Sequence, residues 1–120
     1  MKILKALRGA ICAANEAGDI DAKTIELFDL LLRENDIAEK DLVSLIFSVT
    51  PDLEVQNPAS SLRKSGRARE TAMMVMQEMK TAEGLPGVIR LLAHVYLDEN
   101  AAPRHIYRGA ARTLRPDLGA

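Results

Sequence analysis

Charged side chains stand inside several runs whose other residues have the pattern of buried β-strands. Glu78 follows an apolar run of methionine and valine, Arg90 interrupts a run of valine, isoleucine and leucine, and Arg8 lies among small and apolar residues. Charged groups are rarely buried unless they are paired or bind something. The sequence therefore predicts a sheet that carries a pocket rich in guanidinium groups with one carboxylate.

Five segments have the composition of β-strands, and they are residues 2–13, 42–49, 71–79, 88–97 and 105–114. The second is almost continuously apolar, which predicts burial on both of its faces. Gly109 lies within the fifth segment, where it permits a bulge or a close backbone contact.

A first helix is predicted by apolar side chains at helical spacing, which are Ile20, Thr24, Leu27, Phe28 and Leu31. Asp19 or Asp21 is a suitable N-cap for this helix, and Asn35 is its expected end.

A second, shorter helix is predicted over residues 59–65. Asn57 is a suitable N-cap, Pro58 fits the first helical position, and Gly66 is a typical stop.

This order of elements favours an α+β fold, a five-stranded mixed β-sheet with helices packed on one face, formed as a single domain over residues 1–120. A sheet covered on one side leaves its second face open. Oligomerisation is the natural way to cover that face.

Composition and motifs exclude several classes of function. The net charge of −1 argues against a nucleic-acid or membrane-surface partner, and no apolar run is long enough to span a bilayer. Cys12 is the one cysteine and nothing resembles a leader peptide, so we expect a cytoplasmic protein without an internal disulfide. No metal-ligand cluster or cofactor motif is present, and His94 and His105 are interpreted as structural.

Several short motifs, in order along the chain, resemble the signature of the AroH class of chorismate mutase. They are Arg8-Gly9-Ala10, Thr50-Pro51-Asp52-Leu53, Arg63, Met76-Gln77-Glu78-Met79, Gly84-Leu85-Pro86, Val88-Ile89-Arg90, His105-Ile106-Tyr107 and Leu114-Arg115-Pro116-Asp117-Leu118. The resemblance extends from about residue 4 to residue 118. It implies a homotrimer whose sheets form a pseudo-α/β-barrel, with active sites in clefts between subunits.

The resemblance also implies the reaction, a Claisen rearrangement of the dicarboxylate chorismate to prephenate in phenylalanine and tyrosine biosynthesis. This reaction needs no metal, cofactor or nucleophile. It depends on fixed cations and on confinement of the substrate.

Residue roles follow from the same resemblance. Arg90 would donate to the ether oxygen of the substrate, Arg8 and Tyr107 would bind carboxylate, and Glu78 would accept from the ring hydroxyl and orient the arginines. The remaining expected site residues are Arg63 near the mouth of the pocket, Met74, Val75, Met76 and Gln77 along its wall, and Leu114 and Arg115 near the C-terminus.

Three positions depart from the family pattern. Val75 replaces a cysteine, Asn57 replaces an aromatic residue, and Ser60 replaces a lysine, so we expect catalysis with weaker binding. The alternatives are a non-catalytic trimer that binds a small dicarboxylate or serves regulation, and a module that binds a partner. Glu78 and Arg90 could also be a structural ion pair between adjacent strands.

Overall fold

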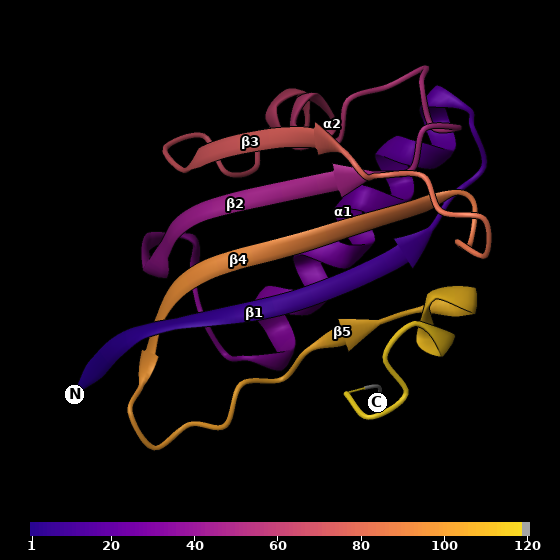
Figure 1. The fold of residues 1–120 in the computed structure, drawn as a ribbon. Coiled ribbons are helices and arrows are strands. Elements are labelled where there is room, and N and C mark those ends of the chain that lie inside the picture. The colour runs from indigo at the N-terminus through magenta and orange to yellow at the C-terminus, as the bar shows by residue number, and fades with distance from the viewer. Residues whose placement is uncertain (119–120) are drawn as a thin grey trace.

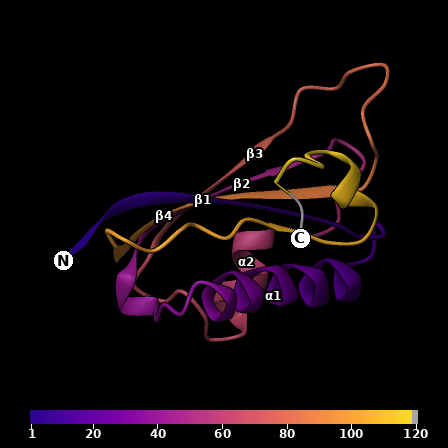
Figure 2. The same ribbon diagram turned by 90° about the horizontal axis from the view of Figure 1, so that it is seen from below.

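A five-stranded mixed sheet covered by two helices makes up the fold, and the computed structural model describes residues 1–118 (Figure 1). In chain order the elements are β1 (Lys2–Cys12), α1 (Ala17–Glu34), a 3-10 turn η1 (Glu39–Asp41), β2 (Leu42–Val49), α2 (Pro58–Lys64), β3 (Ala72–Gln77), β4 (Val88–Asp98), β5 (Ile106–Tyr107) and a second 3-10 turn η2 (Gly109–Thr113). The strand order is β3-β2-β4-β1-β5. Strands β2 and β3, and β1 and β5, pair in parallel, whereas β4 is antiparallel to β1 and β2. The two helices lie on the same side of the sheet, which confirms the predicted α+β class (Figure 2).

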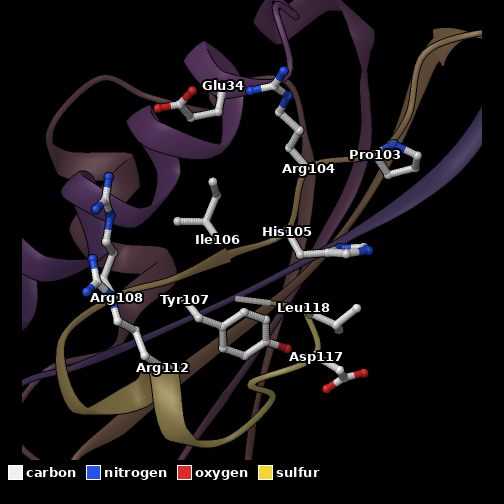
Figure 3. Close-up of a pocket in the computed structure, with 10 residues that line it drawn as sticks. All are labelled: Glu34, Pro103, Arg104, His105, Ile106, Tyr107, Arg108, Arg112, Asp117 and Leu118. Atoms are coloured by element: carbon white, nitrogen blue, oxygen red, sulfur yellow. The ribbon is translucent and has the colours of Figure 1, made fainter. Parts of the chain in front are cut away.

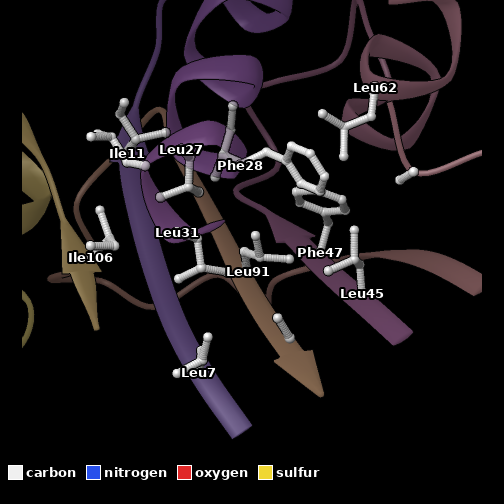
Figure 4. Close-up of a cluster of buried hydrophobic side chains, with 14 of the residues drawn as sticks. Leu7, Ile11, Leu27, Phe28, Leu31, Leu45, Phe47, Leu62, Leu91 and Ile106 are labelled. Atoms are coloured by element: carbon white, nitrogen blue, oxygen red, sulfur yellow. The ribbon is translucent and has the colours of Figure 1, made fainter. Parts of the chain in front are cut away.

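The core lies between the sheet and helix α1. The predicted stripe of α1 is buried as expected, and Phe28 and Leu31 contact a layer that includes Leu7, Phe47 and Leu91 from the strands (Figure 4). Burial of this apolar surface is the main force that holds the helices on the sheet.

The predicted N-cap of α1 is wrong. The helix begins at Ala17, two residues before Asp19, because the Ile20 N–H donates to the Glu16 carbonyl and forms the first turn. Asp19 instead accepts a hydrogen bond of 2.7 Å from the Ala14 N–H and so braces the preceding loop. The predicted end at Asn35 is confirmed, since this residue is the C-cap.

Helix α2 has the predicted signals. The Asn57 side chain accepts hydrogen bonds from the N–H groups of Ala59 and Ser60, Pro58 occupies the first helical position, and Gly66 has a φ of 85° after the last turn. This conformation favours glycine.

Asp21 on α1 fixes α2 in place. Its carboxylate accepts hydrogen bonds from Ser61 Oγ at 2.6 Å, Gln56 Nε2 at 3.0 Å and Lys64 Nζ at 2.6 Å. The bond from Lys64 is the largest cause of a lowered pKa for Asp21, followed by that from Ser61. The carboxylate therefore remains charged and joins the two helices.

Strand β2 has the predicted bounds but not the predicted burial. Leu45 and Phe47 are fully buried, whereas Ser44, Ile46 and Ser48 on the other face are partly exposed. The expectation of burial on both faces is wrong for the chain by itself, because residues 1–118 place no element over the part of the second face that β2 forms. We call this second side of the sheet the open face.

The fifth strand is much shorter than predicted. Only Ile106 and Tyr107 pair with β1, because the chain turns at Gly109, which has a φ of 60°, into η2. Ala111 of η2 is buried against Ala10. Packing of this turn, and not continued strand pairing, holds the C-terminal segment on the sheet.

The longest ladder joins β1 to β4, and it positions two arginines. In its antiparallel register Arg8 is opposite Leu92 and Arg90 is opposite Ala10. Side chains alternate between the two faces of a strand, so Arg8 and Arg90 are neighbours on the open face.

Candidate functional site

A cavity of about 440 Å³ lies on the open face over β1, β2 and β4. Five of the residues expected to form a site line it, and they are Arg8, Met76, Arg90, Tyr107 and Arg115. The sheet register therefore places three guanidinium groups and one phenol around a single hollow.

Arg90 and Glu78 form an ion pair beside this cavity, with 2.6 Å between Arg90 Nε and Glu78 Oε1. The two residues are not on adjacent strands, as one alternative assumed, because β2 lies between β3 and β4. Glu78 reaches Arg90 across the end of β2. The Glu78 N–H donates to the carbonyl of Val49, the last residue of β2. Among residues 1–118, the two terminal nitrogens of Arg90 have no hydrogen-bond acceptor, so they can donate to a ligand.

Arg115 is held by Asp117. Its Nε and one terminal nitrogen donate to the two carboxylate oxygens of Asp117, at 3.0 and 2.8 Å. This paired hydrogen bonding raises the pKa of Arg115 and lowers that of Asp117. Asp117 was not among the expected site residues, although its position two residues after Arg115 could have indicated the pairing.

Arg8 contributes an uncompensated charge. Within the described chain no carboxylate lies within 4.0 Å of its guanidinium, whereas Arg90 and Arg115 each have one. The cavity thus has one more cationic than anionic group around it, which suits a small anion.

The backbone of Arg8 is fixed by a histidine. Its N–H donates to His105 Nδ1 at 2.9 Å. Burial lowers the pKa of His105, and the nearby Arg8 and Arg115 charges lower it further. The ring is therefore neutral at neutral pH.

Tyr107 also lines a second hollow, of about 600 Å³ (Figure 3). Arg104, Arg108 and Arg112 line this larger hollow, but of the expected site residues it contains only Tyr107 among residues 1–118. Leu114 is partly buried and packs against the cluster that includes Tyr107.

Other expected residues lie outside the cavity. Arg63 is exposed on α2, on the helix side of the sheet, and Met74 and Gln77 are exposed on β3. Val75 packs toward the core and shares a shallow hollow of about 340 Å³ with Asn57 at the β3 edge. These residues and Tyr107 lie at opposite edges of the sheet, so one chain does not bring them together.

The Thr50-Pro51-Asp52 motif is a structural turn. Thr50 exchanges two hydrogen bonds with Val88, through its N–H and its hydroxyl, and so fixes the end of β2 to the start of β4. Burial raises the pKa of Asp52, but hydrogen bonds from Thr50 and from the N–H groups of Gly87 and Asp52 outweigh it, so the pKa is lowered.

Neither a metal-binding cluster nor a membrane-spanning helix is present among residues 1–118. No group of three or more His, Cys, Asp or Glu side chains in this range could hold a metal ion. None of the helices in the described part of the chain has the length and apolar character needed to cross a membrane.

The fold and cavity describe a small α+β protein with a site for an anionic small molecule, and comparisons with known proteins identify its family. The model of the family described as chorismate mutase type I matches residues 4–118. The chorismate mutase AroH of Bacillus subtilis is 31% identical over 118 residues, which cover 97% of this chain and 93% of that protein. That of Thermus thermophilus is 34% identical over 119 residues, 97% of each.

A solved structure agrees. A chorismate mutase from Clostridium thermocellum superposes with a TM-score of 0.85 at 34% identity, over 91% of this chain and 98% of that one. The chain therefore belongs to the chorismate mutase type I family, and it is an enzyme of the isomerase class. The resemblance read from the sequence motifs is confirmed.

Proposed function

We propose that this protein converts chorismate to prephenate in the cavity on the open face, and that a homotrimer completes each site. The observation that carries this proposal is the presence of Arg8, Arg90, Tyr107 and Arg115 around one hollow. We also propose a cytoplasmic role in phenylalanine and tyrosine biosynthesis, since the lone Cys12 suits a reducing compartment.

The substrate chemistry matches this set of groups. Chorismate has two carboxylates, a ring hydroxyl and an ether oxygen that gains negative charge as its C–O bond breaks. Arg8 and Arg115 provide cations for the carboxylates, and the Tyr107 phenol provides a further donor. Guanidinium groups bind carboxylates well because their planar fork can donate two parallel hydrogen bonds.

Arg90 is the residue best placed to act on the breaking bond. Its Nε is held by Glu78, so its terminal nitrogens have a fixed direction before substrate arrives. A donor fixed in advance stabilises the developing charge of the transition state more than the ground state. Glu78 retains a second carboxylate oxygen, which can accept a hydrogen bond from the ring hydroxyl.

The walls of the cavity supply confinement. Ile46 on β2, Leu92 on β4 and Met76 on β3 present apolar side chains to the cavity. Contact with these apolar groups favours a compact conformation in which the enolpyruvyl side chain lies over the ring. Holding that conformation removes an entropic part of the barrier.

One chain supplies only part of the expected site. Arg63, Val75 and Asn57 lie toward the β3 edge, and Tyr107 lies at the β5 edge. Two different surfaces that bind each other head to tail form a closed ring when the rotation closes. A three-membered ring would place the β3 edge of one subunit beside the open-face cavity of the next.

Exposed apolar side chains support this assembly. On the open face, Met74 and Met76 of β3 are 60% and 47% exposed, and Leu4 of β1 is 55% exposed. Exposed large apolar side chains on one face of a sheet are typical of an interface between proteins. The same contact would cover the open face and give β2 the burial on both sides that its sequence predicts.

The first experiment tests the reaction. Purified protein should consume chorismate, measured by loss of its absorbance, and should release prephenate without added metal or cofactor. Tight binding of chorismate without turnover would instead support the alternative of a non-catalytic dicarboxylate-binding protein.

The second experiment tests the shared site. Arg63→Ala and Arg90→Ala should each lower kcat/KM, because each variant lacks one residue of every site. After unfolding and joint refolding in equal amounts, random assembly into heterologous rings should restore about a quarter of the intact sites. Light scattering should show a trimer. A stable monomer at micromolar concentration, or no gain in activity on mixing, would contradict the shared site.

A further inference from the structure

We propose that His105 is a positioning residue, whose neutral ring fastens β5 to β1 and thereby fixes Arg8 and Tyr107 on two sides of the cavity. This inference rests on the proposed function for the importance of Arg8 and Tyr107. The contact that carries it is the 2.9 Å hydrogen bond from the Arg8 N–H to His105 Nδ1.

Strand β5 has little pairing of its own. Its register comprises two pairs, Gly9 with Ile106 and Ala10 with Tyr107. The Arg108 N–H adds one bond of 3.0 Å to the Ala10 carbonyl. So short an edge strand frays readily unless other contacts hold it.

His105 adds one more contact between β5 and β1, next to the two paired residues of β5. On the side of β1 that faces β5, the Arg8 N–H meets the imidazole ring where a longer strand would offer a carbonyl. The His105 ring is turned toward β1, and the Tyr107 side chain lies two residues further along (Figure 3). One side chain thus ties the backbone of one binding residue to the strand that carries the other.

Only one form of the ring can make this bond. Nδ1 accepts the Arg8 N–H when it is unprotonated, which places the proton of the neutral ring on Nε2. The imidazolium form has a hydrogen on both nitrogens and accepts nothing. Protonation would therefore replace an attractive contact with the repulsion of two N–H groups.

The surroundings of His105 favour the neutral form. The cations that face it are Arg8 on β1 and Arg115 after η2, and both lower its pKa, although burial is the larger cause. The other charged or titratable groups around the same hollow are Glu34, Arg104, Tyr107, Arg108, Arg112 and Asp117. Asp117 is bound to Arg115, so its charge is largely compensated.

Two substitutions of His105 distinguish its role as a hydrogen-bond acceptor from its role as a group that titrates. His105→Asn places an amide oxygen where Nδ1 lies and removes the group that titrates. His105→Gln places its amide at the position of Nε2 and leaves the Arg8 N–H without an acceptor. The pair has similar size and polarity, so each variant is a control for the other.

We expect His105→Asn to keep kcat/KM within about threefold of the wild type at pH 7.5, and His105→Gln to lose about tenfold, mainly through KM. Below pH 6.5, kcat/KM of the wild type should fall in a step that His105→Asn lacks. Wild-type kcat/KM in His105→Gln, or an unchanged acid step in His105→Asn, would overturn the proposal.

A spectroscopic test does not depend on the variants being active. In ¹⁵N-histidine spectra of the wild-type protein at pH 7.5, His105 should show an unprotonated Nδ1 and a protonated Nε2, with His94 as the internal reference. A proton on Nδ1 would overturn the positioning role, whatever the turnover. A wild-type enzyme without turnover would overturn the proposed function alone.

Discussion

The charge of Arg90 should matter more to turnover than that of any other cavity residue. Two unit charges 4 Å apart interact by about 4 kcal/mol at an effective dielectric constant of 20. The Arg90 side chain is 38% exposed, so water screens part of this, and the ether oxygen gains less than a full charge. Removing one fixed donor from other active sites costs about 2.7–4 kcal/mol.

We therefore expect Arg90→Ala to raise the activation barrier by about 3 kcal/mol, which is roughly a hundredfold in kcat. Initial rates of chorismate consumption over a range of concentrations separate kcat from KM. A lower kcat would show that the interaction forms in the transition state. A higher KM with unchanged kcat would show that Arg90 binds the ground state and the transition state equally. Arg90→Lys keeps the charge without the planar fork, so it should recover only part of the rate.

Replacement of Arg90 with citrulline isolates the charge, because this neutral analogue keeps the shape and most of the donors. It should remain nearly as impaired as Arg90→Ala. The matched control is Glu78→Gln, which retains an acceptor for Arg90 Nε and should cost less than about tenfold if position is preserved. Nearly full turnover with citrulline would refute charge stabilisation and leave positioning by hydrogen bonds to explain the rate.

Three further predictions concern stability and the shared site. Gly87→Ala should lower the free energy of unfolding by about 1–3 kcal/mol, because Gly87 has a φ of 66° and a Cβ there would lie 2.6 Å from the Ala13 carbonyl oxygen; an unchanged melting temperature would contradict this. Asp21→Asn should destabilise the protein at neutral pH, and because the folded pKa of Asp21 is lowered, the difference from wild type should close as the pH falls below about 3.9. Denaturant titrations at pH 7 and pH 2.5 that show the same difference would count against the Asp21 contacts. Val75→Cys should lower KM two- to tenfold, which corresponds to about 0.5–1.5 kcal/mol for one hydrogen bond to the ring hydroxyl; unchanged kinetic constants would show that no such bond forms.

The elements that sequence patterns predicted well are those fixed by local rules. Helix α1 follows from the spacing of its buried side chains, and α2 from Asn57 and Pro58 at its start. The run from Leu42 to Val49 gave the bounds of β2, because its apolar residues are set off by polar neighbours.

The elements that sequence patterns missed depend on distant contacts. The length of β5 is decided by the turn at Gly109 and by packing of η2, neither of which a strand-like composition shows. In the same way, Glu78 meets Arg90 across β2 because of the strand order, and strand order is not a local property.

The candidate site was predictable in part. Motif resemblance indicated Arg8, Arg90, Tyr107 and Arg115, and the fold brings these four around one cavity. Asp117 lies within one of those motifs but was not assigned to the site, because the resemblance attached no role to it and its pairing with Arg115 is seen only in the structure.

The eleven-residue ladder between β1 and β4 links correct folding to the assembly of the candidate site. The register of this ladder determines the positions of Arg8 and Arg90. A slip of one residue in β1 would move Arg8 from the open face into the hydrophobic core and expose Leu7 to solvent. Such a misfolded sheet would lose both cations of the proposed site and its apolar packing in the same step. The register that buries the apolar side chains is therefore the same register that places Arg8 beside Arg90. A chain that folds with native stability has both arginines on the open face.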